Sequence, residues 1–309
     1  MRALQFSAYG PASVLEVAEV PPPHPGPGQI RIAVRASGVT PADGYFRAGR
    51  FKDWIPLSLP FVPGIDASGV VDETGTGVTS VQIGDEVFGT VDYARLGGAN
   101  AEFAVLAAWV PKPASLSWEQ AGGAAGNIET ATRVLDRLGV TTGTTLLIEG
   151  AAGGVGTTAT QLALARGATV IGTASPRNHE FLASLGAVPT SYGPGIADRA
   201  RALAPDGVDA VLDCAASGSL PDLVALAGSP ERVVSIADMN ADAYGVHLSR
   251  SSGPGADPAA HEGLAVAAGL AGRGLFTVPV AAAFPLEDGA AAHELSESRH
   301  ARGKIVLVP

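Results

Sequence analysis

The sequence contains a single cysteine, Cys214, among 309 residues. One thiol cannot form an internal disulfide, and it excludes a metal site built from several cysteines. Basic residues are also few, because 20 Lys and Arg stand against 30 Asp and Glu, for a formal net charge of -10. Nucleic acids and anionic membranes require a basic surface on their partners. We therefore expect the protein to bind neither.

Long apolar runs are missing as well. No stretch reaches the roughly 18 residues that a membrane-spanning helix needs. Residues 1–6 lead into a polar turn, whereas a signal peptide has a longer apolar core. These absences predict a cytoplasmic protein, and a chain of this length predicts two domains.

The first third of the chain reads as short strands joined by turns. Pro and Gly clusters such as Pro21–Pro23 and Pro25–Gly28 separate runs that are apolar or alternate in polarity. Such clusters interrupt strands more often than helices. The pattern predicts a β-rich unit with strands at residues 1–6, 14–20, 29–37, 67–72, 86–91 and 102–110.

The middle of the chain alternates between strands and helices. Ser117 and Gln120 have the spacing of a capping box, which predicts that a helix starts there. A second helix is expected from Ile128 to Leu138 or slightly beyond. Strands at 145–149, 168–173, 208–214 and 232–236, with helices at 155–166 and 177–185, predict βαβ units and a parallel sheet. The final run, 303–308, reads as a strand that returns to the first domain.

A glycine turn follows the first of these strands. Ala151, Gly153 and Gly156 fill the three positions of a dinucleotide-binding fingerprint, with Ala in place of the first Gly, and Gly154 and Val155 complete the turn. Glycines allow the backbone to approach a diphosphate closely, and the next helix offers free N–H groups. The turn predicts a dinucleotide site, although a glycine-rich loop without a ligand would look similar.

The residues that follow the second strand of the βαβ unit, 168–173, indicate which dinucleotide is bound. An NAD site places a carboxylate there for the ribose hydroxyls, whereas an NADP site places cationic or hydroxyl groups. The sequence has no carboxylate here until Glu180, but it has Ser175 and Arg177, which can bind a phosphate. We therefore expect NADPH, although Arg177 alone could be a solvated cation at the start of a helix.

With these motifs in hand, the chain resembles the medium-chain dehydrogenase/reductase superfamily and, within it, the zinc-independent quinone oxidoreductases. In zinc-dependent relatives a Cys and a His occupy the positions of Thr40 and Ile65, neither of which is a zinc ligand. The histidines are not paired at metal-ligand spacing, so no metal is expected. The resemblance rests on ordered motifs at residues 1–4, 34–43, 63–71, 84–87, 151–156 and 303–307.

The resemblance implies an α/β fold with two domains. A GroES-like β-rich catalytic domain would comprise residues 1–122 and 280–309, and a Rossmann domain with a doubly wound parallel sheet would comprise residues 123–279. It also implies a homodimer, and a substrate cleft over the nicotinamide of NADPH.

The resemblance further implies roles for individual residues. Tyr192 and Arg177 correspond to residues beside the adenosine 2′-phosphate, and Thr130 to a residue near the nicotinamide or the phosphates. Thr40, Asp43 and Tyr45 belong to the substrate-side loop.

Several of these residues have a second interpretation. Asn127 would contact the cofactor or cap a helix beginning at Ile128, and Glu129 reads as a first-turn carboxylate favoured by the helix dipole. The hydroxyls of Tyr45 and Thr40 could stabilise negative charge on a substrate oxygen. Tyr45 could instead pack at the domain interface, and Asp43 could cap a loop and not act as an acid.

These observations predict an enzyme that transfers a hydride from NADPH to a small electrophilic substrate, either a quinone or an α,β-unsaturated carbonyl compound. Two alternatives stay open. The polar segments 125–129 and 238–258 would suit an enoyl reductase or a tailoring enzyme acting on a biosynthetic intermediate. A sensor that binds NADPH without turnover is the other, because the sequence shows no obvious general acid.

Overall fold

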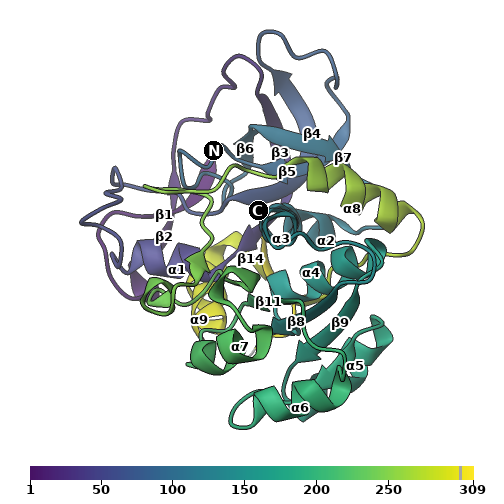
Figure 1. The fold of residues 1–309 in the computed structure, drawn as a ribbon. Helices are drawn as coiled ribbons and strands as arrows, with labels where there is room; N and C mark the ends of the chain where they lie inside the picture. Colours follow the sequence, from purple (N-terminus) through teal and green to yellow (C-terminus); the bar gives the residue numbers. More distant parts are fainter. Residues whose placement is uncertain (299–300) are drawn as a thin grey trace. The chain divides into compact units, whose positions relative to one another are not determined.

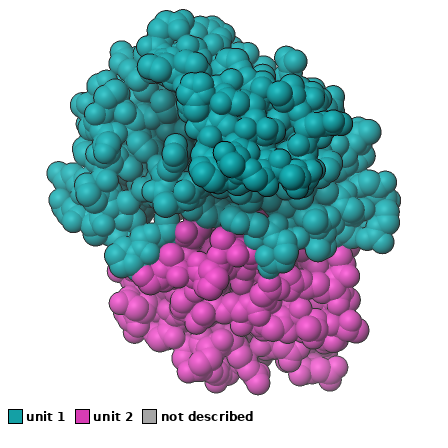
Figure 2. Space-filling model, turned by 90° about the horizontal axis from the view of Figure 1, so that it is seen from above, with its two compact units in different colours: residues 1–127, 252–254, 261–309 teal, residues 128–251, 255–260 magenta. Residues whose placement is uncertain are grey.

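The computed structural model describes residues 1–298 and 301–309 and has an α/β fold with a mixed sheet and a parallel sheet (Figure 1). Its contacts divide the chain into two compact units, coloured separately in Figure 2. Unit 1 contains residues 1–127, 252–254 and 261–309, and unit 2 contains residues 128–251 and 255–260. Among the described residues, no helix combines the length and the apolar character needed to cross a membrane.

Unit 1 is built on a sheet with the strand order β14-β15-β3-β4-β5-β7, in which β6 also pairs with β3. Its buried core includes Ile30 and Ile32 of the long central strand β3, as the alternating pattern predicts. The strands are β1 (Arg2–Phe6), β2 (Leu15–Glu19), β3 (Ile30–Val39), β4 (Asp66–Thr74), β5 (Glu86–Thr90), β6 (Phe103–Leu106), β7 (Ala108–Pro111), β14 (Val280–Pro285) and β15 (Lys304–Val308).

Most of the predicted strands of unit 1 are confirmed. The run 102–110 forms two strands, because the chain changes partner at Ala107, whose N–H donates to the carbonyl of Thr90 at 2.9 Å. The C-terminal strand β15 pairs with β3, which confirms that the chain end returns to the first unit. Strand β14 was not predicted.

Four α-helices belong to unit 1 among its described residues. The sequence predicted the start of α2 correctly, since Ser117 accepts a hydrogen bond from the N–H of Gln120. It missed α1, which begins at Pro41 behind a capping box of Thr40 and Asp43. The helices are α1 (Pro41–Arg47), α2 (Trp118–Gly122), α8 (Glu262–Gly272) and α9 (Gly289–Glu297).

Unit 2 contains a parallel sheet with the strand order β10-β9-β8-β11-β12-β13, as expected for a doubly wound dinucleotide-binding unit. The strands are β8 (Thr145–Glu149), β9 (Thr169–Thr173), β10 (Val188–Thr190), β11 (Ala210–Asp213), β12 (Val233–Ser235) and β13 (His247–Leu248). The helices are α4 (Gly154–Ala165), α5 (His179–Ser184), α6 (Ile196–Leu203) and α7 (Leu220–Ala227).

The boundary between the units differs from the predicted domain limits at 122/123 and 279/280. Helix α3 (Ala125–Arg137) contains the first boundary, at residue 127, because the N–H of Gly126 donates to Asp66 in unit 1. Residues 261–279 group with unit 1 and not with the parallel sheet. The hydroxyl of Ser115 donates to the carbonyl of Ala271 in α8 at 2.9 Å, which holds this helix against the first unit.

Candidate functional site

The glycine turn joins β8 to α4 at the carboxyl end of the parallel sheet. Gly150 adopts a left-handed conformation, with φ of +78°. Its N–H donates to the hydroxyl of Thr173 at 3.1 Å, and the N–H of Ala151 donates to the carbonyl of the same residue at 3.0 Å. Because the left-handed position falls on Gly150 and not on Ala151, alanine replaces the first glycine of the fingerprint without strain.

Gly156 and Gly153 are glycines for different physical reasons. A Cβ on Gly156 would lie 2.4 Å from the carbonyl oxygen of Gly150, so glycine is required there for the helix to pack against the turn. A Cβ on Gly153 would meet only that same oxygen, at an ordinary 3.4 Å, and its φ is -78°. The chain's own packing therefore does not require Gly153. Bare backbone at this point fits the close approach of a diphosphate.

Helix α4 starts at Gly154, directly after this open position. The amides of Gly154, Val155 and Gly156 belong to its first turn, where N–H groups lack partners within the helix. The N-terminal end of the helix dipole also favours an anion. The turn thus provides the donor set and the space that a diphosphate requires.

The next two strands, β9 and β10, bring the three predicted 2′-phosphate residues to the same edge. Thr173 of β9 and Thr190 of β10 are register partners, and the N–H of Ala174 donates to the carbonyl of Thr190 at 2.9 Å. Ser175 and Arg177 follow β9, whereas Tyr192 follows β10. The expected helix 177–185 is a 3-10 turn at Pro176–Asn178 followed by α5.

The predicted 2′-phosphate residues are accessible. The side chain of Arg177 is exposed, and it forms no ion pair within residues 1–298 and 301–309. Tyr192 is 56% exposed, and the half-buried Ser175 accepts a hydrogen bond of 3.4 Å from the amide of Asn178. A cation and two hydroxyl-bearing side chains at adjacent strand ends can together bind a phosphate.

A buried pair of carboxyl groups beside the turn escaped the sequence analysis. Glu149 and Asp213 end the neighbouring strands β8 and β11, and neither is accessible. Glu149 accepts hydrogen bonds from Ser217 and Ser219 at 2.9 and 2.6 Å. Burial raises the pKa of Glu149, and the nearby charge of Asp213 raises it further. The sequence shows a carboxylate at the end of each apolar strand, but it does not show that the two strands are neighbours.

Asn127 lies inside the first turn of α3 and does not cap a helix at Ile128, because α3 begins earlier, at Ala125. Its side chain is 7% exposed, and its Nδ2 has no hydrogen-bond partner among the described residues. A buried donor without a partner costs stability unless a ligand or water satisfies it. The cap interpretation was wrong, and the cofactor contact stays a prediction with this geometry in its favour.

Thr130 is tied to a buried ion pair. Its hydroxyl donates to Glu129 at 3.3 Å and lies 3.4 Å from Nη2 of Arg133. Glu129 is inaccessible and accepts a 2.8 Å hydrogen bond from Nε of Arg133, so it is more than a dipole-favoured first-turn carboxylate. Its other contact, a 3.2 Å hydrogen bond from the N–H of Ala260, fixes the segment after β13 to α3.

The predicted substrate-side residues form the start of helix α1, which is held by a capping box. The hydroxyl and the N–H of Thr40 both donate to Asp43, at 2.8 and 2.7 Å. Asp43 is 2% exposed and also accepts a 3.0 Å hydrogen bond from the N–H of Gly64. Burial raises its pKa, against the effect of these hydrogen bonds. These contacts are those of a carboxylate that caps the N-terminus of α1, and not those of a general acid.

Tyr45, which is also in α1, belongs to an aromatic cluster that continues into the residues after the helix. Its ring meets the ring of Phe51 edge-on at 6.1 Å, and the guanidinium of Arg50 lies 4.7 Å from its centroid. Trp54 continues the cluster, with its ring 5.0 Å from Phe51. The loop after α1 therefore presents apolar, flat surfaces.

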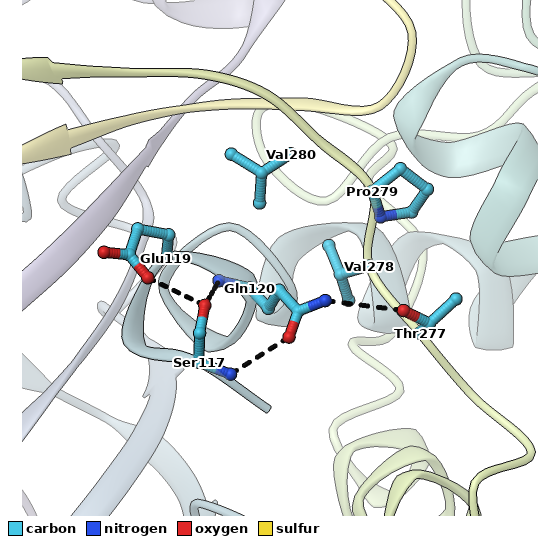
Figure 3. A pocket seen from close by; sticks show the side chains of 7 residues that line it. All are labelled: Ser117, Glu119, Gln120, Thr277, Val278, Pro279 and Val280. Carbon is cyan, nitrogen blue, oxygen red and sulfur yellow. Dashed lines mark hydrogen bonds between the residues drawn. The ribbon is translucent and has the colours of Figure 1, made fainter. Parts of the chain in front are cut away.

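A separate surface hollow of about 500 Å³ in unit 1 contains none of the predicted site residues. Figure 3 shows it beside the capping box of Ser117 and Gln120, whose amide donates to Thr277 at 3.4 Å. Nothing in its lining matches the chemistry of the glycine turn.

The comparisons with known proteins agree with this geometry. Residues 26–132 match the family model described as alcohol dehydrogenase GroES-like domain, and residues 191–307 match the model described as zinc-binding dehydrogenase. A quinone oxidoreductase of Sus scrofa is 31% identical over 100% of this chain and 98% of its own length. The chain belongs to the medium-chain dehydrogenase/reductase superfamily. Its fold is therefore a GroES-like unit joined to a Rossmann unit, as predicted.

Other members of the superfamily extend the likeness. A 2-methylene-furan-3-one reductase of Solanum lycopersicum is 35% identical over 60% of this chain and 50% of its own length. A solved quinone oxidoreductase from Coxiella burnetii is 30% identical with a TM-score of 0.84, covering 100% of this chain and 99% of that one. A mycobacterial protein solved in complex with NADPH is 28% identical with a TM-score of 0.80, and both chains are covered completely.

One family description names zinc. Within the described residues of this medium-chain dehydrogenase/reductase, no group of three or more His, Cys, Asp and Glu side chains is arranged to hold a metal ion. His300, one of the six histidines, lies outside the described residues.

Proposed function

We propose that this oxidoreductase binds NADPH in unit 2 and transfers a hydride to a quinone or an α,β-unsaturated carbonyl compound. The observation that carries the proposal is the turn at Gly153, where the protein's own packing leaves room for a side chain but the sequence has none. A diphosphate bound close to the backbone would explain why this position is a glycine. The full-length likeness to quinone oxidoreductases supports the acceptor class.

The choice of NADPH over NADH rests on Ser175, Arg177 and Tyr192. They stand at the ends of two paired strands, with no carboxylate between Thr173 and Glu180. The structural neighbour solved with NADPH supports the same choice. Bound NADPH would supply the hydride, and the orphan amide of Asn127 would hold the cofactor in place.

The acceptor gains negative charge on its oxygen, so a nearby hydrogen-bond donor lowers the barrier. We assign this role to the hydroxyl of Tyr45, which the family resemblance places on the substrate side, whereas the hydroxyl of Thr40 donates to Asp43. Thr40 and Asp43 would then fix the start of α1, the helix that carries Tyr45. The aromatic cluster around Phe51 and Trp54 would suit a flat, apolar substrate.

Turnover tests this proposal. The protein should oxidise NADPH with small quinones and enones, and Tyr45→Phe should lower kcat about ten-fold, the loss of one hydrogen bond to a developing charge. Tyr244→Phe, at a residue that is 45% exposed in unit 2, is the matched control. A flat absorbance trace across the acceptor panel would refute the reductase activity, and tight NADPH binding without turnover would favour the sensor alternative.

The narrower alternative, an enoyl reductase or tailoring enzyme, has one structural observation in its favour. The polar segment around Asp257 is bound to α3 by Ser249 and Arg133, at the helix that carries Asn127. A marked preference for larger enoyl substrates over simple quinones would favour this narrower function.

We also propose a homodimer, for which light scattering should give twice the 31.0 kDa chain mass.

A further inference from the structure

Arg199 of α6 binds the backbone of the loop that precedes its own helix. Its Nε and Nη2 donate to the carbonyl oxygen of Ser191 at 3.2 and 2.9 Å, and its Nη1 donates to that of Pro194 at 2.8 Å. Nη2 also donates to the carbonyl oxygens of Tyr192 and Gly193, at 3.3 and 3.1 Å. One rigid guanidinium thus holds four consecutive carbonyl groups.

Among residues 1–298 and 301–309, no carboxylate forms an ion pair with Arg199. Its neighbour Asp198 pairs with Arg201 at 3.0 Å. The half-buried guanidinium therefore acts on the loop carbonyls and adds a positive charge to this edge of unit 2.

The loop at residues 191–195 needs the hydrogen bonds from Arg199 because its two glycines allow many backbone conformations. Gly193 and Gly195 both adopt left-handed conformations, with φ of +87° and +79°, on either side of Pro194. Glycines have many accessible conformations, so this path is not fixed by local sterics. The five hydrogen bonds from Arg199 select it.

We propose that Arg199 is a positioning residue for recognition of the 2′-phosphate of NADPH, an inference that rests on the proposed function. Arg199 fixes the main chain of Tyr192, whose side chain is exposed. The loop follows β10, which pairs with the strand leading to Ser175 and Arg177. By binding the carbonyl oxygens, Arg199 also offsets their partial negative charge near an anion site.

The test compares Arg199→Met and Arg199→Lys with the wild type, and uses Arg201→Met on the same helix as the control. Titration with NADPH and NADH should show that Arg199→Met raises the Kd for NADPH about ten-fold and changes the Kd for NADH less than about two-fold. Arg199→Lys should behave like Arg199→Met, because a single ammonium cannot span four carbonyls. The kcat at saturating NADPH should be unchanged in both variants, and Arg201→Met should match the wild type.

A double-mutant cycle shows whether Arg199 acts through Tyr192. The effects of Arg199→Met and Tyr192→Phe on the NADPH/NADH ratio should be less than additive. An unchanged ratio in Arg199→Met, full rescue by Arg199→Lys, or an equal loss of both nucleotides would each overturn the positioning role. A wild-type protein that does not prefer NADPH would instead contradict the proposed function itself.

Discussion

Glu149 and Asp213 lie opposite each other on neighbouring parallel strands, at the end of the sheet where the glycine turn begins. Two inaccessible carboxyl groups at this edge would repel a diphosphate if both were charged. The raised pKa of Glu149 favours its neutral form, which reduces that repulsion. The electrostatics of the pair therefore bear on both stability and cofactor binding.

Glu149→Gln should stabilise the protein increasingly as the pH rises. A carboxyl group whose pKa is raised in the folded state contributes stability below its unfolded pKa, about 4.3, and loses it as pH rises through the folded pKa. The neutral amide avoids that loss, so the difference in thermal midpoint between variant and wild type should grow above this pH. Glu119→Gln is the control with the opposite sign, because a hydrogen bond from Ser117 lowers the pKa of Glu119. A difference that is constant with pH would contradict the assignment.

His293 should make unit 1 sensitive to acid. It is 1% exposed in α9, and burial, aided by the charge of Arg47 and opposed by that of Glu297, lowers its pKa to about 4. The unfolded chain takes up a proton near pH 6.5 that the folded chain takes up only near pH 4. The free energy of unfolding therefore has its full value above pH 6.5 and falls by about 3 kcal/mol as the pH drops from 6.5 to 4.

The pH dependence of urea unfolding checks this effect. His293→Leu should flatten the curve between pH 6.5 and 4, whereas His24→Leu, at a side chain that is 74% exposed, should leave it unchanged. Parallel curves for His293→Leu and the wild type would show that His293 does not carry the acid sensitivity.

The ion pair of Glu129 and Arg133 should be critical for unit 2. Removing Arg133 leaves the inaccessible carboxylate of Glu129 without its cation, which costs about 3–5 kcal/mol for buried pairs. Arg133→Met should lower the free energy of unfolding by about that amount. Arg137→Met on the same helix removes a cation whose side chain is 46% exposed, and should cost less than about 1 kcal/mol. Equal effects of the two variants would refute the distinction.

The sequence predicted the positions of most strands along the chain, and the glycine turn, because both depend on local patterns. Apolar strands bounded by glycines are visible in the residues themselves. The Glu149–Asp213 pair was missed because it depends on which strands are neighbours, and the register that joins β8 to β11 is not local.

The other differences between prediction and structure have similar causes. Asn127 was interpreted as a cap because helix ends are weakly encoded, and α3 begins two residues before it. Residues 261–279 were grouped with the second domain because the sequence does not show that Ser115 binds the carbonyl of Ala271 in α8. The clamp of Arg199 depends on the backbone angles of Gly193 and Gly195, which the sequence permits but does not specify.

Gly156 and Gly153 should respond differently to substitution by alanine. At Gly156 the new Cβ would lie 2.4 Å from the carbonyl oxygen of Gly150 and 2.7 Å from Cα of Ala151. Neither backbone atom can move cheaply, so Gly156→Ala should lower the free energy of unfolding by about 1–3 kcal/mol, the cost of overpacking. Urea unfolding measures this loss, and an unchanged midpoint would show that the turn adapts.

Gly153→Ala provides the most direct test of the central claim that this turn binds the diphosphate of NADPH. The added methyl group fits the protein, with its nearest contact at 3.4 Å. It occupies, however, the space that the diphosphate needs in order to approach the protein backbone closely. Calorimetric titration should show NADPH bound at least about ten-fold more weakly, whereas the free protein should lose no more than about 1 kcal/mol of stability, the cost of replacing the glycine N-cap of α4 by alanine. Wild-type affinity for NADPH in Gly153→Ala would contradict the account.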